Sequence, residues 1–186
     1  MSKPVPKFPT SGIYPWVKQY IQSLPTLHGK VALDIPCGDG RATAVLRESG
    51  ADVLAYDLFP ESFLLDGQAQ FADLAERLPL PDDSIDIVVC QEGIEHLPNQ
   101  LLALQEFHRV LKPGGTLVYA VCSLEQEEGE DRAADVELTL APITAGELPE
   151  GLSPTGEGWL RTDPGMLAEA GGLDGFFVAR LRAPSS

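Results

Sequence analysis

Residues 33–41 read LDIPCGDGR, and this stretch decides how the rest of the chain is interpreted. A short apolar run, KVALDI, enters the glycine-containing turn, and a segment with helical character, RATAVLRESG, leaves it. A turn of this kind points backbone N–H groups of a helix N-terminus at a ligand and is typical of nucleotide-like cofactor sites. The same letters contain Asp-x-Pro-Cys, so the competing interpretation is that the turn presents Cys37 as a reactive thiol.

Outward from this turn, short apolar runs alternate with helical patterns. The predicted strands are KVALDI (30–35), ADVLAYD (51–57), AQFAD (69–73), IDIVVC (85–90), TLVYAVC (116–122) and DGFFVARLR (174–182). The predicted helices cover residues 13–24, 41–50 and 98–111, and a further one begins at Pro60. Alternation with tight connections predicts a doubly wound α/β fold around a mostly parallel sheet, with helices on both faces.

The ligand site of such a sheet lies at the carboxyl ends of its strands. Four groups of residues directly follow predicted strands, namely 34–40, Asp57, Asp73 and 91–96. We therefore expect them to share one rim of the molecule. The whole chain, 1–186, is expected to form one domain, with a helical segment over 1–28, a core over 29–122 and a closing tail over 123–186.

Composition narrows the possible partners. The formal net charge is −15, and residues 123–150 alone carry nine acidic residues and one arginine, which would repel phosphate backbones and disfavours nucleic acid as a partner. No apolar run approaches the roughly 20 residues that cross a bilayer, and no leader pattern is visible. The three cysteines lack metal-ligand spacing, which predicts a cytoplasmic protein without a metal. The oligomeric state is left open.

The acids around the turn indicate which cofactor is bound. Gly38 and Gly40 let the backbone approach a ligand closely. Asp57 ends the second predicted strand, where a carboxylate can accept hydrogen bonds from both hydroxyls of a ribose. Asp34 faces the turn, and its charge suits a cationic amine or sulfonium better than a pyrophosphate. These features favour S-adenosylmethionine over a dinucleotide.

Three segments carry a resemblance to a known family: VALDIPCGDGRATAVLRESGADVLAYDLFPESF (31–63), FADLAERLPLPDDSIDIVVCQEGIEHLPN (71–99) and EFHRVLKPGGTLVYAV (106–121). Over residues 30–121 the chain resembles the small-domain, type 11-like branch of the class I S-adenosylmethionine-dependent methyltransferases. The resemblance implies a seven-stranded Rossmann-like sheet that ends in an antiparallel hairpin, and a methyltransferase activity.

The same resemblance implies roles for individual residues. The methionine part of the cofactor would lie against Asp34, Pro36, Cys37, Gly38 and Gly40. The ribose would lie against Asp57 and Leu58, the adenine edge against Asp73 and Leu74, and the sulfonium beside Gln91. Pro36 departs from the family, which usually has its first glycine there. Because proline has no N–H, the turn loses one hydrogen-bond donor, which implies weaker binding or a displaced cofactor.

The tail adds a second resemblance. LVYAVCSLEQEEGED (117–131) and GGLDGFFVARLR (171–182) are similar to the C-terminal part of RNA cytosine-5 methyltransferases of the ribosomal small-subunit type. In that family a cysteine after the fifth strand attacks the cytosine ring, and Cys122 lies at the corresponding place. CQEGIEHL (90–97), however, replaces that family's Asp-Ala-Pro-Cys motif. We therefore expect a small-molecule acceptor, with Cys122 as a buried strand cysteine and Cys37 as a bystander in a glycine turn.

Methyl transfer to a small molecule needs mainly alignment of the acceptor, with a base where the acceptor is a hydroxyl or an acidic carbon. His96 is the first candidate for that base, with Glu92 and Glu95 behind it, and Tyr14 and Trp16 are candidates to roof the pocket. In the RNA alternative the catalytic group is Cys122. A third possibility is a noncatalytic cofactor-binding or recombinant domain, because two branches of one superfamily appear in one chain.

Overall fold

The computed structural model describes residues 18, 19, 21, 22, 24, 26–170 and 172–185. The helix predicted over residues 13–24 lies largely outside these residues, as do Tyr14 and Trp16. The strands of the sheet are, in chain order, β1 (Val31–Asp34), β2 (Asp52–Asp57), β3 (Gln70–Phe71), β4 (Ile85–Gln91), β5 (Leu111–Val121), β6 (Thr139–Leu140), β7 (Leu160–Thr162) and β9 (Phe176–Arg182).

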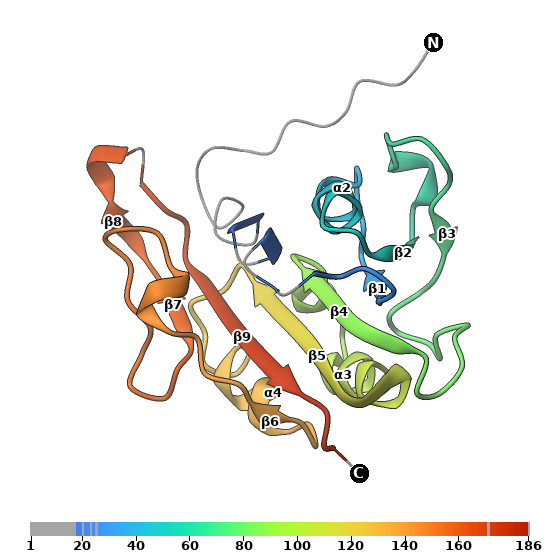
Figure 1. The fold of residues 1–186 in the computed structure, drawn as a ribbon. Coiled ribbons are helices and arrows are strands. Elements are labelled where there is room, and N and C mark those ends of the chain that lie inside the picture. The colour runs from blue at the N-terminus through green and yellow to red at the C-terminus, as the bar shows by residue number, and fades with distance from the viewer. Residues whose placement is uncertain (1–17, 20, 23, 25, 171, 186) are drawn as a thin grey trace.

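These strands form one sheet with the order β3-β2-β1-β4-β5-β9-β6. The pairs from β3 to β5 are parallel, whereas β9 runs antiparallel to β5, as their opposed arrowheads in Figure 1 show. β6 and β7 both pair antiparallel with β9, β6 at Leu181–Arg182 and β7 at Phe176–Val178. The predicted fold class is thereby confirmed, and the tail contributes its antiparallel edge.

The sheet has eight strands where the resemblance implied seven. The difference arises on the outer edge of β9, where an excursion over residues 142–159 separates two short strands, β6 and β7, that pair with one partner. Ile143 and Leu148 of this excursion are buried against the sheet. Glu147 accepts a hydrogen bond from Arg180 of β9, which ties the excursion to the strand that it interrupts.

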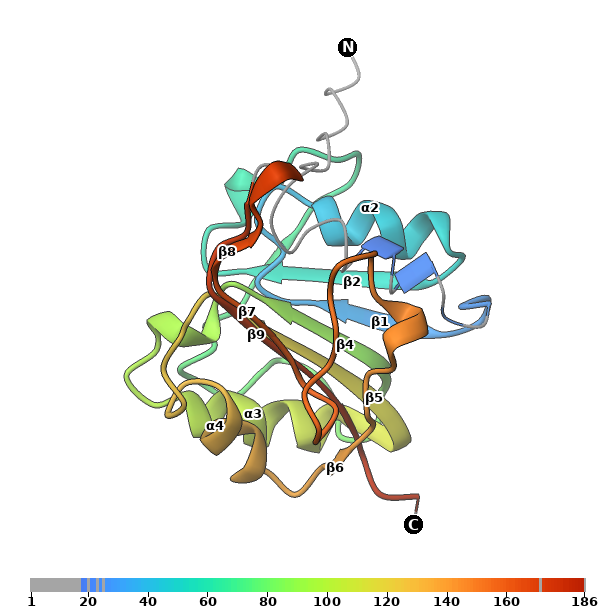
Figure 2. The same cartoon turned by 90° about the vertical axis from the view of Figure 1, so that its left-hand side faces the viewer.

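Side chains alternate between two cores, one on each face of the sheet. On β4, Val88 and Cys90 belong to one core, while Ile87 and Val89 belong to the other. The same alternation on β5 and β9 makes these central strands apolar on both faces, as a sheet covered on both sides requires. Figure 2 shows α2 (Arg41–Glu48) on one side, and α3 (Gln100–Val110) and α4 (Glu130–Ala134) on the other.

The remaining elements are short. They are η1 (Pro60–Ser62), η2 (Ile94–His96), η3 (Ala145–Glu147), η4 (Ala168–Ala170) and β8 (Pro164–Leu167). The helix predicted to begin at Pro60 is therefore only one 3₁₀ turn, because Phe63 leaves it in an extended conformation. No helix among the described residues is long and apolar enough to cross a membrane.

The ends of α2 explain why the helix fits between β1 and β2. It starts at Gly40, whose φ of 95° is left-handed, and a Cβ there would lie 2.8 Å from the ring of Phe63. Its C-terminal end is closed by Gly50: the N–H of Gly50 donates to the Arg47 carbonyl, and the N–H of Ala51 donates to the Leu46 carbonyl. This is a Schellman motif, for which glycine is preferred, and it confirms the predicted stop at Gly50.

A charged cluster lies at the amino-terminal end of the parallel strands. Asp86 of β4 accepts hydrogen bonds from Lys112 (2.6 Å), Lys30 (3.0 Å) and the backbone N–H of Val31 (3.0 Å). Burial by itself would raise the pKa of the Asp86 carboxyl, but the bonds from Lys112, Val31 and Lys30 outweigh it and lower the pKa to about 2. The cluster therefore joins the starts of β1, β4 and β5.

Candidate functional site

A cavity of about 390 Å³ opens at the carboxyl ends of β1, β2 and β4. Its lining residues come from these strand ends, from the turn after β1 and from the start of α2: Asp34, Pro36, Cys37, Gly38, Asp39, Arg41, Ala42, Asp57, Gln91 and Glu92. The volume falls within the roughly 300–1,000 Å³ of typical small-molecule sites. The predicted rim is thus confirmed for the segments that follow β1, β2 and β4.

Asp34 is the central charged group of the cavity wall. It is 2% exposed, and its carboxylate accepts a hydrogen bond from the hydroxyl of Thr43, which is itself fully buried on α2. No ion pair involves Asp34 among the residues that the structure describes. Burial raises the pKa of Asp34 to about 7, the Thr43 hydroxyl partly offsets this, and the nearby charges of Asp57 and Asp39 add to it. Within the described part of the chain, the Asp34 carboxylate is therefore buried without a cation to pair with it.

Asp57 fixes the shape of the turn. Its Oδ2 accepts the backbone N–H of Gly38 (2.8 Å) and its Oδ1 accepts that of Phe59 (2.8 Å). A carboxylate has about four acceptor positions, so each oxygen can still accept a bond from a ligand hydroxyl. Asp57 therefore holds the glycine turn against the end of β2 while remaining on the cavity wall.

Cys37 is a buried part of the turn. Its backbone N–H donates to the Tyr56 carbonyl (2.9 Å), and burial, followed by the charges of Asp34 and Asp57, raises the pKa of its thiol. A thiol in this setting stays protonated and is a poor nucleophile. The competing interpretation of the opening stretch is thereby disfavoured, and the glycine turn is the better description.

Pro36 lines the cavity, and the Ile35–Pro36 peptide bond is cis. Gly40, also predicted to contact the cofactor, lies outside the cavity lining at the N-cap of α2. Its place in the structure is explained by Phe63 and Leu65, which lie where any side chain at position 40 would project.

Two residues at the end of β4 form the opposite wall. The Nε2 atom of Gln91 is buried and has no hydrogen-bond partner among the described residues. A buried amide donor costs free energy unless a ligand accepts its hydrogen bond. Glu92, with a left-handed φ of 51°, lines the same wall, so it is the candidate base that the structure places on the cavity.

The other candidate catalytic residues lie farther round the rim. His96 is exposed at the end of η2 and is outside the cavity lining. Glu95 is half-buried, and its Oε1 accepts the backbone N–H of Cys122 (3.3 Å). The predicted adenine residues, Asp73 and Leu74, and the ribose neighbour, Leu58, also lie outside the lining of this cavity. These assignments remain predictions.

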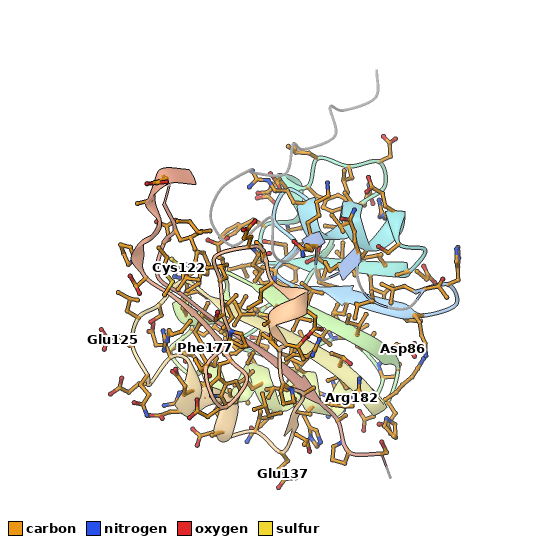
Figure 3. The ribbon with its side chains drawn as sticks, turned by 60° about the vertical axis from the view of Figure 1, so that its left-hand side comes forward. Asp86, Cys122, Glu125, Glu137, Phe177 and Arg182 are labelled. Carbon is orange, nitrogen blue, oxygen red and sulfur yellow. The ribbon has the colours of Figure 1, made fainter. Side chains whose placement is uncertain are left out.

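Cys122 differs from the prediction, since it is exposed and follows the last residue of β5, whereas we expected a buried strand position. Figure 3 labels it at the opposite side of the molecule from Asp86. Partial burial, followed by the charges of Glu92, Asp174 and Glu95, raises the pKa of its thiol. Glu92 and Glu95 lie in the segment between β4 and α3, and Asp174 lies just before β9.

Sequence reasoning missed Thr43, the hydrogen-bond donor to Asp34. It also missed Arg41 and Ala42 of α2, which line the cavity. Asp39 and Arg41 form an ion pair of 2.8 Å at the start of α2. The available signal was helical spacing from the turn, because residues 41–43 form the first turn of the helix that follows Gly40.

Residues 33–119 match the family model described as Methyltransferase domain. The demethylmenaquinone methyltransferase of Staphylococcus epidermidis is 36% identical over 115 residues, which cover 55% of this chain and 47% of that protein. The ubiquinone biosynthesis O-methyltransferase of Xanthomonas campestris pv. campestris is 34% identical over 125 residues, which cover 60% of this chain and 51% of that protein. The chain therefore spans about half the length of these relatives, and the family match ends before Cys122.

Solved structures extend the similarity over nearly the whole chain. A methyltransferase from Haloferax volcanii, solved in complex with the Trm112 methyltransferase activator, superposes with a TM-score of 0.66 at 24% identity, covering 91% of this chain and 90% of that one. An S-adenosylmethionine-dependent methyltransferase from Mesorhizobium loti superposes with a TM-score of 0.60 at 21% sequence identity. The superposition covers 93% of this chain and 98% of that one. The chain has the Rossmann-like fold of these methyltransferases.

Proposed function

We propose that this chain, whose residues 33–119 match the methyltransferase domain family, transfers a methyl group from S-adenosylmethionine to a small-molecule acceptor. Residues 29–122 would bind the cofactor, and residues 123–186 would complete the sheet beside it. The observation that carries the proposal is Asp34, a buried carboxylate that lies on the wall of a cavity and forms no ion pair with any described residue. A ligand that brings positive charge to this carboxylate offsets the cost of burying it.

The groups around the cavity fit the parts of this cofactor. Asp34 would bind the amine and face the sulfonium, and Asp57 has acceptor positions left for the ribose hydroxyls. The buried amide donor of Gln91 has no hydrogen-bond partner among the described residues, so an acceptor on the ligand would satisfy it. Asp73 and Leu74 would bound the adenine, as the sequence resemblance implies. When bound, S-adenosylmethionine supplies a methyl group already activated as a sulfonium.

The protein must then align the acceptor and, for a hydroxyl or an acidic carbon, accept a proton. Glu92 is the best-placed base because it lines the cavity, and His96 is a second candidate on the adjacent turn. The names of the relatives, demethylmenaquinone methyltransferase and ubiquinone biosynthesis O-methyltransferase, make phenols and quinols the first acceptors to test.

The RNA alternative depends on a thiolate at Cys122. Its partial burial and the three carboxylates around it raise the pKa of that thiol, which opposes thiolate formation. The net charge of −15 also opposes binding of a phosphate backbone. We therefore favour a small-molecule acceptor over RNA.

Calorimetric titration with S-adenosylmethionine and S-adenosylhomocysteine tests the cofactor site, with Asp57→Ala as the site variant. Asp52→Ala is the matched control, because Asp52 is the exposed first residue of the same strand. We expect micromolar binding to the wild type and to Asp52→Ala, and none to Asp57→Ala. A wild-type chain that binds neither compound would contradict the proposal. Transfer of labelled methyl groups to a panel of phenols and quinols then tests the activity.

A further inference from the structure

The place where this chain departs from its family, Pro36, faces a glycine on another loop. An ideal Cβ built on Gly93 would lie 2.4 Å from both Cδ and Cγ of the Pro36 ring. Real Cβ atoms do not approach other atoms so closely, because the van der Waals contact distance between carbons is roughly 3.5–4.0 Å. Gly93 has a φ of −148°, so no left-handed conformation requires glycine there. The proline ring is what requires it.

Backbone hydrogen bonds and burial anchor both loops on either side of the contact. On the side of Pro36, the amide of Ile35 bonds the Val89 carbonyl (3.0 Å) and the amide of Cys37 bonds that of Tyr56 (2.9 Å). On the side of Gly93, the amide of Glu92 bonds the Ala120 carbonyl (3.0 Å), and Ile94 is fully buried in the core. A side chain at position 93 would therefore clash with the Pro36 ring, and the segments around Pro36 and Gly93 would have to shift.

Those segments form two walls of the proposed cofactor site. Pro36 itself lines the cavity, and so do Gln91 and Glu92, which immediately precede Gly93. Gly93 does not line the cavity. A side chain added at position 93 would thus change the cavity without touching any bound molecule.

We propose that Pro36 and Gly93 are a matched pair of positioning residues, in which the proline ring packs on the bare glycine and sets the distance between the cofactor turn and the loop of Gln91 and Glu92. This inference rests on the proposed cofactor site. It also explains how the chain accommodates a proline where its family has glycine: the space that the ring occupies is left free by the second glycine.

The test is a cycle of three variants, Gly93→Ala, Pro36→Gly and the double variant, titrated with S-adenosylhomocysteine. We expect Gly93→Ala to bind at least roughly tenfold more weakly than the wild type. The double variant should bind within about threefold of Pro36→Gly, because the ring that the new methyl group meets is gone. Gly156→Ala is the matched control, since a Cβ at Gly156 meets nothing within 4 Å.

Rescue of cofactor affinity in the double variant distinguishes this pair from a glycine that matters only for folding. Wild-type affinity in Gly93→Ala, or a double variant that binds more than about threefold more weakly than Pro36→Gly, would overturn the proposal. If Gly93→Ala does not fold, the double variant decides: a folded, binding double variant supports the pair, and an unfolded one refutes it. If the wild type binds no cofactor, the proposed function fails. The pair is then judged by the midpoints of thermal unfolding: adding Pro36→Gly to Gly93→Ala must restore the midpoint that Gly93→Ala lowers.

Discussion

Two aspartates near opposite ends of the same parallel strands have opposite surroundings. Asp86, at the amino-terminal end, accepts bonds from two lysines and an amide, and its pKa is lowered to about 2. Asp34, at the carboxyl end, has one hydroxyl donor and two nearby acids, and its pKa is raised to about 7. The first carboxylate stabilises the fold, whereas the second destabilises it. The difference is what the proposed function predicts: a carboxylate available to a cationic ligand at the carboxyl end, and a paired carboxylate that stabilises the fold at the amino end.

The largest expected effect concerns binding. Asp34→Asn keeps the size of the side chain and an acceptor for the Thr43 hydroxyl, but it removes the charge that would attract the cofactor. We expect affinity for S-adenosylmethionine to fall roughly hundredfold, about 3 kcal/mol, as for a charged hydrogen bond lost from a buried site. Calorimetric titration measures it, and an unchanged affinity would remove Asp34 from the cofactor site.

The same substitution should act on stability in the opposite direction. With a folded-state pKa near 7 and an unfolded value of 3.8, Asp34 binds more protons when folded, so its contribution to stability falls as the pH rises from about 4 to 7. Asp34→Asn should therefore be more stable than the wild type at pH 8, by about 2 kcal/mol, and the gain should shrink towards pH 4. Urea denaturation at both pH values measures this difference; a variant less stable than the wild type at pH 8 would contradict it.

Asp86→Asn should show the reverse pattern. Its depressed pKa contributes stability that is present above the unfolded value of 3.8 and is lost as the pH falls through about 2. Because both lysines are partly exposed, we expect a loss of only about 1–2 kcal/mol at pH 7. Cofactor affinity should stay within about twofold of the wild type, since this cluster is at the other end of the strands. A loss of binding as large as that of Asp34→Asn would erase the contrast between the two ends.

The contrast also predicts a pH dependence for the wild-type site. Only the ionised Asp34 attracts a cation, so affinity for S-adenosylmethionine should rise with pH through the pKa of about 7. Between pH 6 and 7.5 we expect a rise of roughly five- to tenfold, accompanied by release of a proton on binding. Titrations in buffers with different ionisation enthalpies detect that proton. Asp34→Asn is the control and should show a flat profile over the same range.

The smallest effect is expected at Cys122. If the acceptor is a small molecule, the exposed thiol takes no part in the reaction, and Cys122→Ser should leave turnover within about twofold of the wild type and stability within about 0.5 kcal/mol. Methyl transfer to RNA that disappears in this variant would instead establish the thiol mechanism.

The strands, the glycine turn and the acids after the strands could be predicted because each depends on local spacing along the chain. Asp34, Asp57 and Gln91 could be placed on one rim for the same reason, since parallel strands align their carboxyl ends. The exposure of Cys122 could not, because the position where β5 ends depends on its pairing with β9. Nor could the contact of Pro36 with Gly93, because two loops far apart in sequence meet only when β1 and β4 pair.

The tandem arrangement of β6 and β7 has a further consequence for how the chain behaves at high concentration. Unpaired backbone groups on a long outer strand are templates for pairing with another molecule, which leads to aggregation. Here the seven-residue β9 is shielded by two short strands, and the opposite side of the sheet ends in the two-residue β3. Both margins of the sheet therefore offer only short stretches to a second chain, which limits intermolecular β-pairing.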